Sequence, residues 1–145
     1  MKPESTLANS DYTLVVVEDD VIARMVISDY LRKCGYEVIE ASNAAEAIAV
    51  LSADEPVDLV FADIQLPGEW DGLRLAEWIR QHRRDTTILL TSGYAKSAEL
   101  AGKLCLPGSF MSKPYQPADA GRQIADLLAH RASGSNVAKP PKPVS

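Results

Sequence analysis

Polar side chains that are suited to phosphate and metal chemistry follow apolar runs at four places in this 145-residue chain. They are Glu18, Asp19 and Asp20 after residues 14–17, Asp63 after 57–62, Thr91 after 87–90, and Lys113 shortly after 110–111. Each alone has an ordinary explanation, because an Asp after a strand is most often a helix cap and a Lys before Pro is usually solvated. Four such positions, one basic, one hydroxyl and the rest acidic, favour a shared site instead.

The residue types themselves indicate which chemistry a shared site would perform. Glu18, Asp19 and Asp63 would repel one another at close range unless a positive ion lay between them. Mg²⁺ fits best, since it takes one or two carboxylates and keeps waters and phosphate oxygens as its other ligands. A carboxylate beside such an ion can attack a phosphoryl group, while an ammonium neutralises charge and a hydroxyl donates a hydrogen bond. Asp63, Lys113 and Thr91 match those three roles.

The elements that must position these residues alternate between short apolar runs and segments of helical period. That alternation is typical of parallel strands joined by helical crossovers. The predicted strands are residues 14–17, 37–41, 57–62, 87–90 and 110–111. The first is continuously apolar, like a strand buried on both faces, whereas the second alternates, like a strand nearer an edge. Because the carboxyl ends of parallel strands lie at one edge, and ligands bind there where strand order reverses, the polar residues should converge.

Helical signals fill the intervals between the strands and predict a three-layer α/β fold. Ile22, Val26 and Tyr30 share one face of a predicted helix that ends at Gly35. The other helices are marked by the capping-box pair Asn43 and Glu46, by Leu75 and Ile79, and by Pro117 before Ile124, Leu127 and Leu128. Residues 95–107 have poor periodicity, so we expect a short or mobile helix there.

Composition and charge limit the class of protein. A net charge of -5 argues against non-specific attraction to nucleic acid or to an anionic membrane. There is no apolar run of the ~20 residues that a membrane span needs and no signal-peptide layout at the start, so we expect a cytoplasmic protein. Cys34 and Cys105 lack the spacing of a zinc or redox pair and are expected to be reduced thiols. We predict one domain over residues 11–131, with flexible tails at 1–10 and 132–145, the latter containing Pro and Lys.

Five short stretches of the sequence resemble the signature of the response regulator receiver domain of two-component signal transduction. They are VEDD at 17–20, DIQLP at 63–67, DG at 71–72, TSGY at 91–94 and SKP at 112–114. The resemblance implies a five-stranded parallel sheet of flavodoxin-like order 2-1-3-4-5 with about five helices. It also implies transfer of a phosphoryl group to Asp63 from the phosphohistidine of a sensor histidine kinase or a histidine phosphotransfer protein.

The resemblance further assigns roles to individual residues. Asp19 would bind Mg²⁺ directly, Glu18 directly or through water, and the backbone carbonyl of Gln65 would complete the protein ligands. Thr91 would move toward the phosphoryl group and Phe110 would turn inward behind it, which alters the surface offered to a downstream protein. The chain would then be a regulatory domain that promotes its own phosphorylation and dephosphorylation, not an enzyme with a separate substrate.

Two departures from the common pattern of the family carry consequences. Glu18 stands where Asp is more frequent, and its longer side chain favours a water-bridged metal contact. The segment 68–70 is one residue longer than usual. Trp70 is therefore expected to do one of three things: cover the site, bind a partner or pack on the following helix.

Several alternatives remain open at this level. The domain could be a stand-alone regulator, a phosphate relay or sink, or a part of a larger kinase. A less favoured hypothesis is a Mg²⁺-dependent phosphohydrolase that uses an aspartyl phosphate, similar to the haloacid dehalogenase-like enzymes. Those enzymes need an Asp two residues after the nucleophile, and this chain has Gln65 at that position. No glycine-rich nucleotide-binding motif occurs, which sets aside a nucleotide-binding protein.

Overall fold

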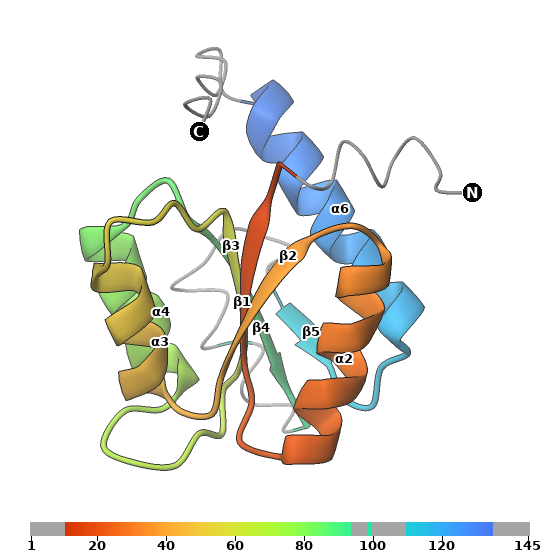
Figure 1. Cartoon of the computed structure of the whole chain (residues 1–145). Coiled ribbons are helices and arrows are strands. Elements are labelled where there is room, and N and C mark those ends of the chain that lie inside the picture. The colour runs from red at the N-terminus through yellow and green to blue at the C-terminus, as the bar shows by residue number, and fades with distance from the viewer. Residues whose placement is uncertain (1–10, 94–98, 100–109, 135–145) are drawn as a thin grey trace.

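A twisted sheet of five parallel strands forms the centre of the molecule (Figure 1). The computed structural model of the chain describes residues 11–93, 99 and 110–134. The strands are β1 (Thr13–Val17), β2 (Glu37–Ala41), β3 (Leu59–Asp63), β4 (Thr87–Ser92) and β5 (Phe110–Ser112). They lie side by side in the order β2-β1-β3-β4-β5, which confirms the predicted order and places β2 at an edge.

Helices cover both faces of this sheet, so the predicted three layers are present. The helices are α2 (Val21–Lys33), α3 (Ala44–Ser52), α4 (Gly72–His82) and α6 (Pro117–Gly134). Figure 1 shows α3 and α4 on one face, with α2 and α6 on the other. Four helices thus occur in the described part of the chain, against about five expected. No helix among the described residues is long and apolar enough to cross a membrane.

Some expectations fall on residues that the structure does not describe. The predicted helix within 95–107 lies outside the described residues except for residue 99. The predicted tails lie outside them too, except for residues 132–134, which belong to α6.

The three central strands, β1, β3 and β4, are buried on both faces because their side chains alternate between two cores. On β1, Leu14 and Val16 pack in the core under α2 and α6, whereas Val15 and Val17 pack in the core under α3 and α4. Each of these four side chains is at most 1% exposed. The four consecutive apolar residues of this strand therefore pack in two interfaces at once.

The predicted apolar face of α2 is wrong. Ile22 and Val26 are 71% and 52% exposed, and of the three expected residues only Tyr30 packs against the core. The buried residues of this helix are Ile27, Ser28 and Leu31. Apolar residues occupy most positions of the helix, so its sequence allows two different buried faces, and contact with α6 and the sheet selects one.

The termini of the helices follow the local signals in the sequence. Asp20 is the N-cap of α2, with its side chain accepting a 3.0 Å hydrogen bond from the Ala23 N–H. Asn43 caps α3 in the same way through the Glu46 N–H at 2.8 Å. Gly35 has φ of 104°, the left-handed conformation expected after this helix. Asp20 therefore has the capping role that was the ordinary explanation for it.

An ion pair connects α6 to the sheet at the edge opposite to the carboxyl ends of the strands. Asp58, only 3% exposed, accepts hydrogen bonds from the Thr13 N–H at 2.8 Å and from Nη2 of Arg131 at 3.1 Å. Nη1 of Arg131 also donates to the backbone carbonyl of Asp58 at 2.7 Å. A charged residue at the start of an apolar strand is thus satisfied by a partner far along the chain.

Candidate functional site

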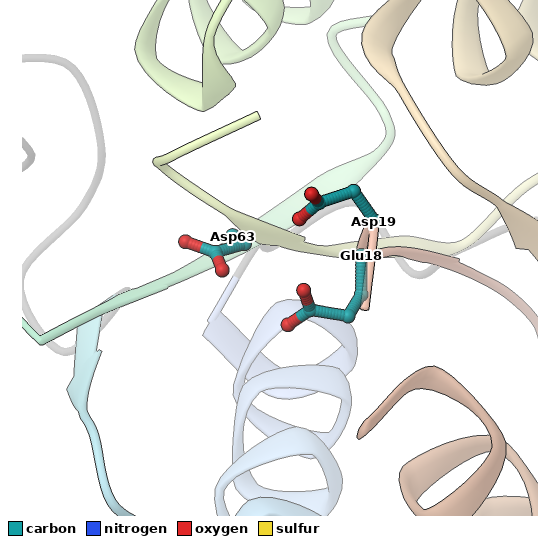
Figure 2. A group of neighbouring side chains, drawn as sticks. All are labelled: Glu18, Asp19 and Asp63. Atoms are coloured by element: carbon teal, nitrogen blue, oxygen red, sulfur yellow. The ribbon is translucent and has the colours of Figure 1, made fainter. Parts of the chain in front are cut away.

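Three carboxylates meet at the carboxyl edge of the sheet. Glu18 and Asp19 directly follow β1, and Asp63 is the last residue of β3, the strand beside it. Each offers one carboxylate oxygen, and these oxygens all lie within 4.8 Å of one another (Figure 2). Glu18 and Asp63 are 6% and 5% exposed, whereas Asp19 faces solvent.

Lys113 supplies a positive charge between two of these carboxylates. Its Nζ lies 2.6 Å from Oδ2 of Asp63 and 3.1 Å from Oε1 of Glu18. Its backbone N–H donates to the Ser92 carbonyl at 3.0 Å, which fixes its main chain beside β4. Partial burial lowers the pKa of the Lys113 ammonium, but the hydrogen bonds and charges of Asp63 and Glu18 outweigh this effect and raise that pKa above its ordinary value. The ammonium therefore stays charged.

One ammonium does not fully balance the negative charge at this place. Burial is the main reason why the pKa of Glu18 is raised, and the neighbouring charge of Asp63 raises it further. The Asp20 N–H, 3.1 Å from Oε2 of Glu18, and the Lys113 ammonium lower that pKa without reversing the shift. The carboxylates would therefore be stabilised by a further positive charge.

The donor set fits a magnesium ion. Mg²⁺ binds oxygen at about 2.0–2.1 Å, so opposite ligands of one ion lie about 4.2 Å apart. The carboxylate oxygens of the site lie within 4.8 Å of one another, so small side-chain movements would bring them to distances at which one ion can bind all three. Asp19 is exposed, so water can reach the positions that the protein leaves free.

Thr91 places a hydroxyl group beside Asp63 in the sheet. The two residues are paired in the register of β3 and β4. Thr91 is 2% exposed, and its Oγ1 has no hydrogen-bond partner in the described part of the chain. A buried hydroxyl without a partner costs free energy, and such a group calls for a ligand or another functional explanation.

Gln65, two residues after the end of β3, contacts Asp63 and β4. Its backbone N–H donates to Oδ1 of Asp63 at 2.9 Å, and its side-chain Oε1 accepts from Oγ of Ser92 at 2.7 Å. Sequence reasoning proposed only the backbone carbonyl of Gln65 for the site and gave Ser92 no role. The one signal for Ser92 is its place directly after Thr91.

Gly72 permits the start of α4 to lie against the end of β3. A Cβ atom at this position would lie 2.4 Å from the backbone oxygen of Asp63 and 2.7 Å from Cα of Ile64. The Gly72 N–H donates to the Ile64 carbonyl at 2.8 Å. The absence of a side chain, and not backbone freedom, is what this position requires.

Phe110 and Trp70, the two aromatic residues singled out in the sequence, both pack beside the core under α3 and α4. Phe110 pairs with Leu90 in the sheet and is half-buried. The guanidinium carbon of Arg74 lies 4.9 Å from the centre of the Trp70 ring. Of the three roles considered for Trp70, packing with the following helix is the one observed.

The sequence profile of the response regulator receiver domain matches residues 14–124. Among curated proteins, the transcriptional regulatory protein AruR of Pseudomonas aeruginosa is 33% identical over 119 residues, which are 79% of this chain and 48% of AruR. The aerobic respiration control protein ArcA of Escherichia coli K12 is 28% identical over 116 residues, which are 80% of this chain and 48% of ArcA. The chain thus spans about half the length of these relatives.

Solved structures share the fold. A response regulator receiver protein from Sinorhizobium medicae has a TM-score of 0.75 and 26% identity, over 83% of this chain and 96% of that one. The response regulator protein TrrA of Thermotoga maritima, in complex with Mg²⁺-BeF, has a TM-score of 0.70 and 27% identity, over 80% of this chain and 98% of that one.

Proposed function

The chain belongs to the response regulator receiver domain family, and on that premise we propose that it is a signalling switch in which Asp63 accepts a phosphoryl group from a partner's phosphohistidine. The observation that carries the proposal is the set of side chains around Asp63. A buried carboxylate has an ammonium at 2.6 Å, two further carboxylates within 4.8 Å, and an unpaired hydroxyl on the neighbouring strand. Nucleophile, charge neutralisation and hydrogen-bond donor are thus all present.

The transfer exchanges one bond at phosphorus. A carboxylate oxygen of Asp63 forms the new P–O bond, while the P–N bond to the donor imidazole breaks and its electron pair remains on that nitrogen. Lys113 contacts the Asp63 carboxylate before transfer, and its ammonium offsets the charge of the phosphoryl oxygens afterwards. The Gln65 N–H holds one oxygen of the carboxylate and limits the rotation of the nucleophile.

Mg²⁺ is the proposed cofactor, held by the carboxylates of Glu18, Asp19 and Asp63 and by the backbone carbonyl of Gln65. When it is bound, it neutralises the carboxylates and the incoming phosphoryl oxygens together. Glu18 is partly satisfied by Lys113 and the Asp20 N–H, which supports a contact through water for this residue. Asp19 is exposed and caps no helix, so its carboxylate is available to the ion directly.

The phosphohistidine donor is proposed to dock on the first turns of α2. The exposed large apolar residues of the described chain are Val21, Ile22, Met25 and Val26, all on this helix. A pocket of about 540 Å³ adjoins them, and its lining includes Val26 together with Glu18 and Lys113 of the site. Exposed apolar side chains continuous with the reacting groups fit a partner that must bring a histidine to Asp63.

Phosphorylation is proposed to change the output surface through Thr91 and Phe110. The hydroxyl of Thr91 has no hydrogen-bond partner in the described part of the chain, and we propose that it moves with the end of β4 to donate to a phosphoryl oxygen on Asp63. β5 pairs with β4, so Phe110 would follow this movement. A few kcal/mol of differential interaction at the site suffices to change which conformation dominates.

The place of this domain in a pathway is a separate question. Stand-alone regulator, relay or sink, and receiver of a larger kinase all need the same site, and each acts through a protein contact in the cytoplasm, where we place the domain. Transfer assays against individual histidine kinases and histidine phosphotransfer proteins distinguish these roles.

Intact-mass measurement tests the phosphoacceptor. Incubation with acetyl phosphate and Mg²⁺ should add one acid-labile phosphoryl group, and Asp63→Asn should abolish the addition. Asp85→Asn, which changes an exposed carboxylate in the loop before β4, is the control and should label normally. Unchanged labelling of the Asp63→Asn variant would reject the assignment.

A further inference from the structure

We propose that Arg24 is a positioning residue for the metal-binding turn at Glu18 and Asp19, an inference that rests on the proposed Mg²⁺ site. Arg24 lies in the first turns of α2, and its side chain is 17% exposed. Its Nη1 donates to the backbone carbonyl of Glu18 at 2.7 Å. Within the metal-binding turn, the guanidinium therefore forms its hydrogen bond with the main chain and not with a carboxylate of the described residues.

Holding this carbonyl orients Asp19. The carbonyl of Glu18 and the N–H of Asp19 belong to one planar peptide group, so a fixed direction of the carbonyl fixes the plane from which Asp19 continues. The preceding N–H, that of Glu18, donates to the Ala41 carbonyl at 3.0 Å. Asp20 then begins α2 as its N-cap. Without Arg24, the peptide group between residues 18 and 19 would lose the side-chain hydrogen bond that sets its orientation.

Glu40 on β2 holds the other end of the guanidinium and balances its charge. Nε of Arg24 lies 3.1 Å from Oε1 of Glu40, while Nη1 of Arg32 lies 3.0 Å from Oε2 of the same carboxylate. A cation close to a metal site would weaken binding of Mg²⁺ by repulsion. Pairing with Glu40 removes much of that repulsion and lets Arg24 act through hydrogen-bond geometry.

Arg32 provides a matched control on the same helix. It pairs with Glu40 and Asp29 and donates to the Val38 carbonyl at 3.0 Å, so its hydrogen bonds and ion pairs lie away from Glu18 and Asp19 in the described structure. Arg32→Met therefore removes a comparable bond between α2 and β2 without touching the metal-binding turn. Arg24→Lys keeps the positive charge but replaces the planar guanidinium, whose separate nitrogens contact the Glu18 carbonyl and Glu40, with a single ammonium of different geometry.

Calorimetric titration of the full chain with MgCl₂ tests the proposal, alongside urea unfolding without the ion. Arg24→Met is expected to raise the Mg²⁺ dissociation constant about tenfold or more, as loss of outer-shell partners commonly does, while Arg32→Met leaves it unchanged. Arg24→Lys should fall between Arg24→Met and the unaltered chain. If Arg24→Met does not fold, the comparison of Arg24→Lys with Arg32→Met replaces it. A higher Mg²⁺ dissociation constant for Arg24→Lys supports the positioning role, and equal constants overturn it.

The outcomes separate this inference from the metal site itself. If the unaltered chain takes up no Mg²⁺, the proposed cofactor is wrong. If the unaltered chain binds Mg²⁺ and Arg24→Met binds it equally well, the metal site stands and the positioning role is wrong. Equal weakening in Arg24→Met and Arg32→Met also overturns the role, because helix packing would then explain both.

Discussion

The ammonium of Lys113 lies 2.6 Å from the carboxylate of Asp63, although the two residues are fifty positions apart in the chain. The same ammonium contacts Glu18 at 3.1 Å from the other side. Lys113 therefore acts as the counter-ion of these two carboxylates. The contact connects the stability of the resting domain with its chemistry, and the first prediction follows from it.

Lys113→Met should leave two buried carboxylates facing each other without a cation. We expect the unfolding free energy at neutral pH to fall by about 1–3 kcal/mol, below the value for a fully buried pair because Lys113 is partly exposed. Mg²⁺ should then stabilise the variant more than the unaltered chain, since it replaces the lost positive charge. Urea unfolding with and without Mg²⁺ measures both effects. Equal stabilisation of the two proteins by Mg²⁺ would show that Lys113 is not the counter-ion.

Thr91→Val should separate stability from switching. The substitution removes a buried, unpaired hydroxyl at constant shape, so the unfolding free energy of the unphosphorylated domain should rise by about 1 kcal/mol. The phosphorylated form should gain less stability from its phosphoryl group, because one donor is missing. Ser28→Ala, at the other buried hydroxyl without a partner, is the control and should leave the phosphorylated form unaffected. Thermal unfolding before and after acetyl phosphate treatment measures how much the phosphoryl group stabilises each protein. Equal stabilisation of Thr91→Val and the unaltered chain would contradict the role of Thr91 as a donor to the phosphoryl group.

Gly72→Ala should disturb the end of β3 directly. Its Cβ would lie 2.4 Å from the backbone oxygen of Asp63, so either α4 or the end of β3 must shift. We expect a loss of about 1–3 kcal/mol of unfolding free energy and slower labelling of Asp63. Gly93→Ala places its Cβ in open space and should keep the stability of the unaltered chain. Comparable urea midpoints for the two variants would mean that the packing of α4 on β3 does not depend on the absence of a side chain at Gly72.

Ile22→Ser should distinguish a protein phosphodonor from a small one. Ile22 is 71% exposed, so the substitution removes apolar surface without opening the core. Transfer from the phosphorylated partner should slow about tenfold, while the rate of labelling by acetyl phosphate should not change. Lys33→Ser, exposed at the other end of α2, should transfer normally. A rate from the partner that is unaffected by Ile22→Ser would place the docking surface elsewhere.

Tyr36→Phe should make the domain more resistant to alkali. Burial, together with the neighbouring Cys34 and Tyr12, raises the pKa of Tyr36 to about 12. The unfolded chain ionises this phenol near pH 10, so the stabilisation from the neutral hydroxyl is complete below about pH 10 and is lost between about pH 10 and 12. The loss amounts to at most about 2.7 kcal/mol, at 1.36 kcal/mol for each unit of pKa. The urea midpoint should fall less between about pH 9 and pH 11.5 in Tyr36→Phe than in the unaltered chain. An equal fall in both proteins would contradict the assignment.

Much of the fold and of the candidate site could be predicted from local patterns in the sequence. Continuous apolar runs such as residues 14–17 suit a strand covered on both faces, and parallel strands bring their carboxyl ends to one edge. Asp63, Thr91 and Lys113 could therefore be assigned to one place before any coordinates existed. Pro117 and the pair Asn43 and Glu46 marked helix starts correctly, because caps depend on residues within one turn.

Which side chains complete and support the candidate site was decided only by the tertiary structure. The helix at residues 21–33 is apolar around most of its surface, so its sequence could not decide between burying Ile22 and burying Ile27; packing against α6 and the sheet did. Pairs such as Arg131 with Asp58, and the close approach of Gly72 to Asp63, join residues whose separation in the chain bears no relation to their distance in space. Periodicity reports which residues need burial or a polar partner, whereas the partner itself is fixed only when strands and helices from distant parts of the chain pack together.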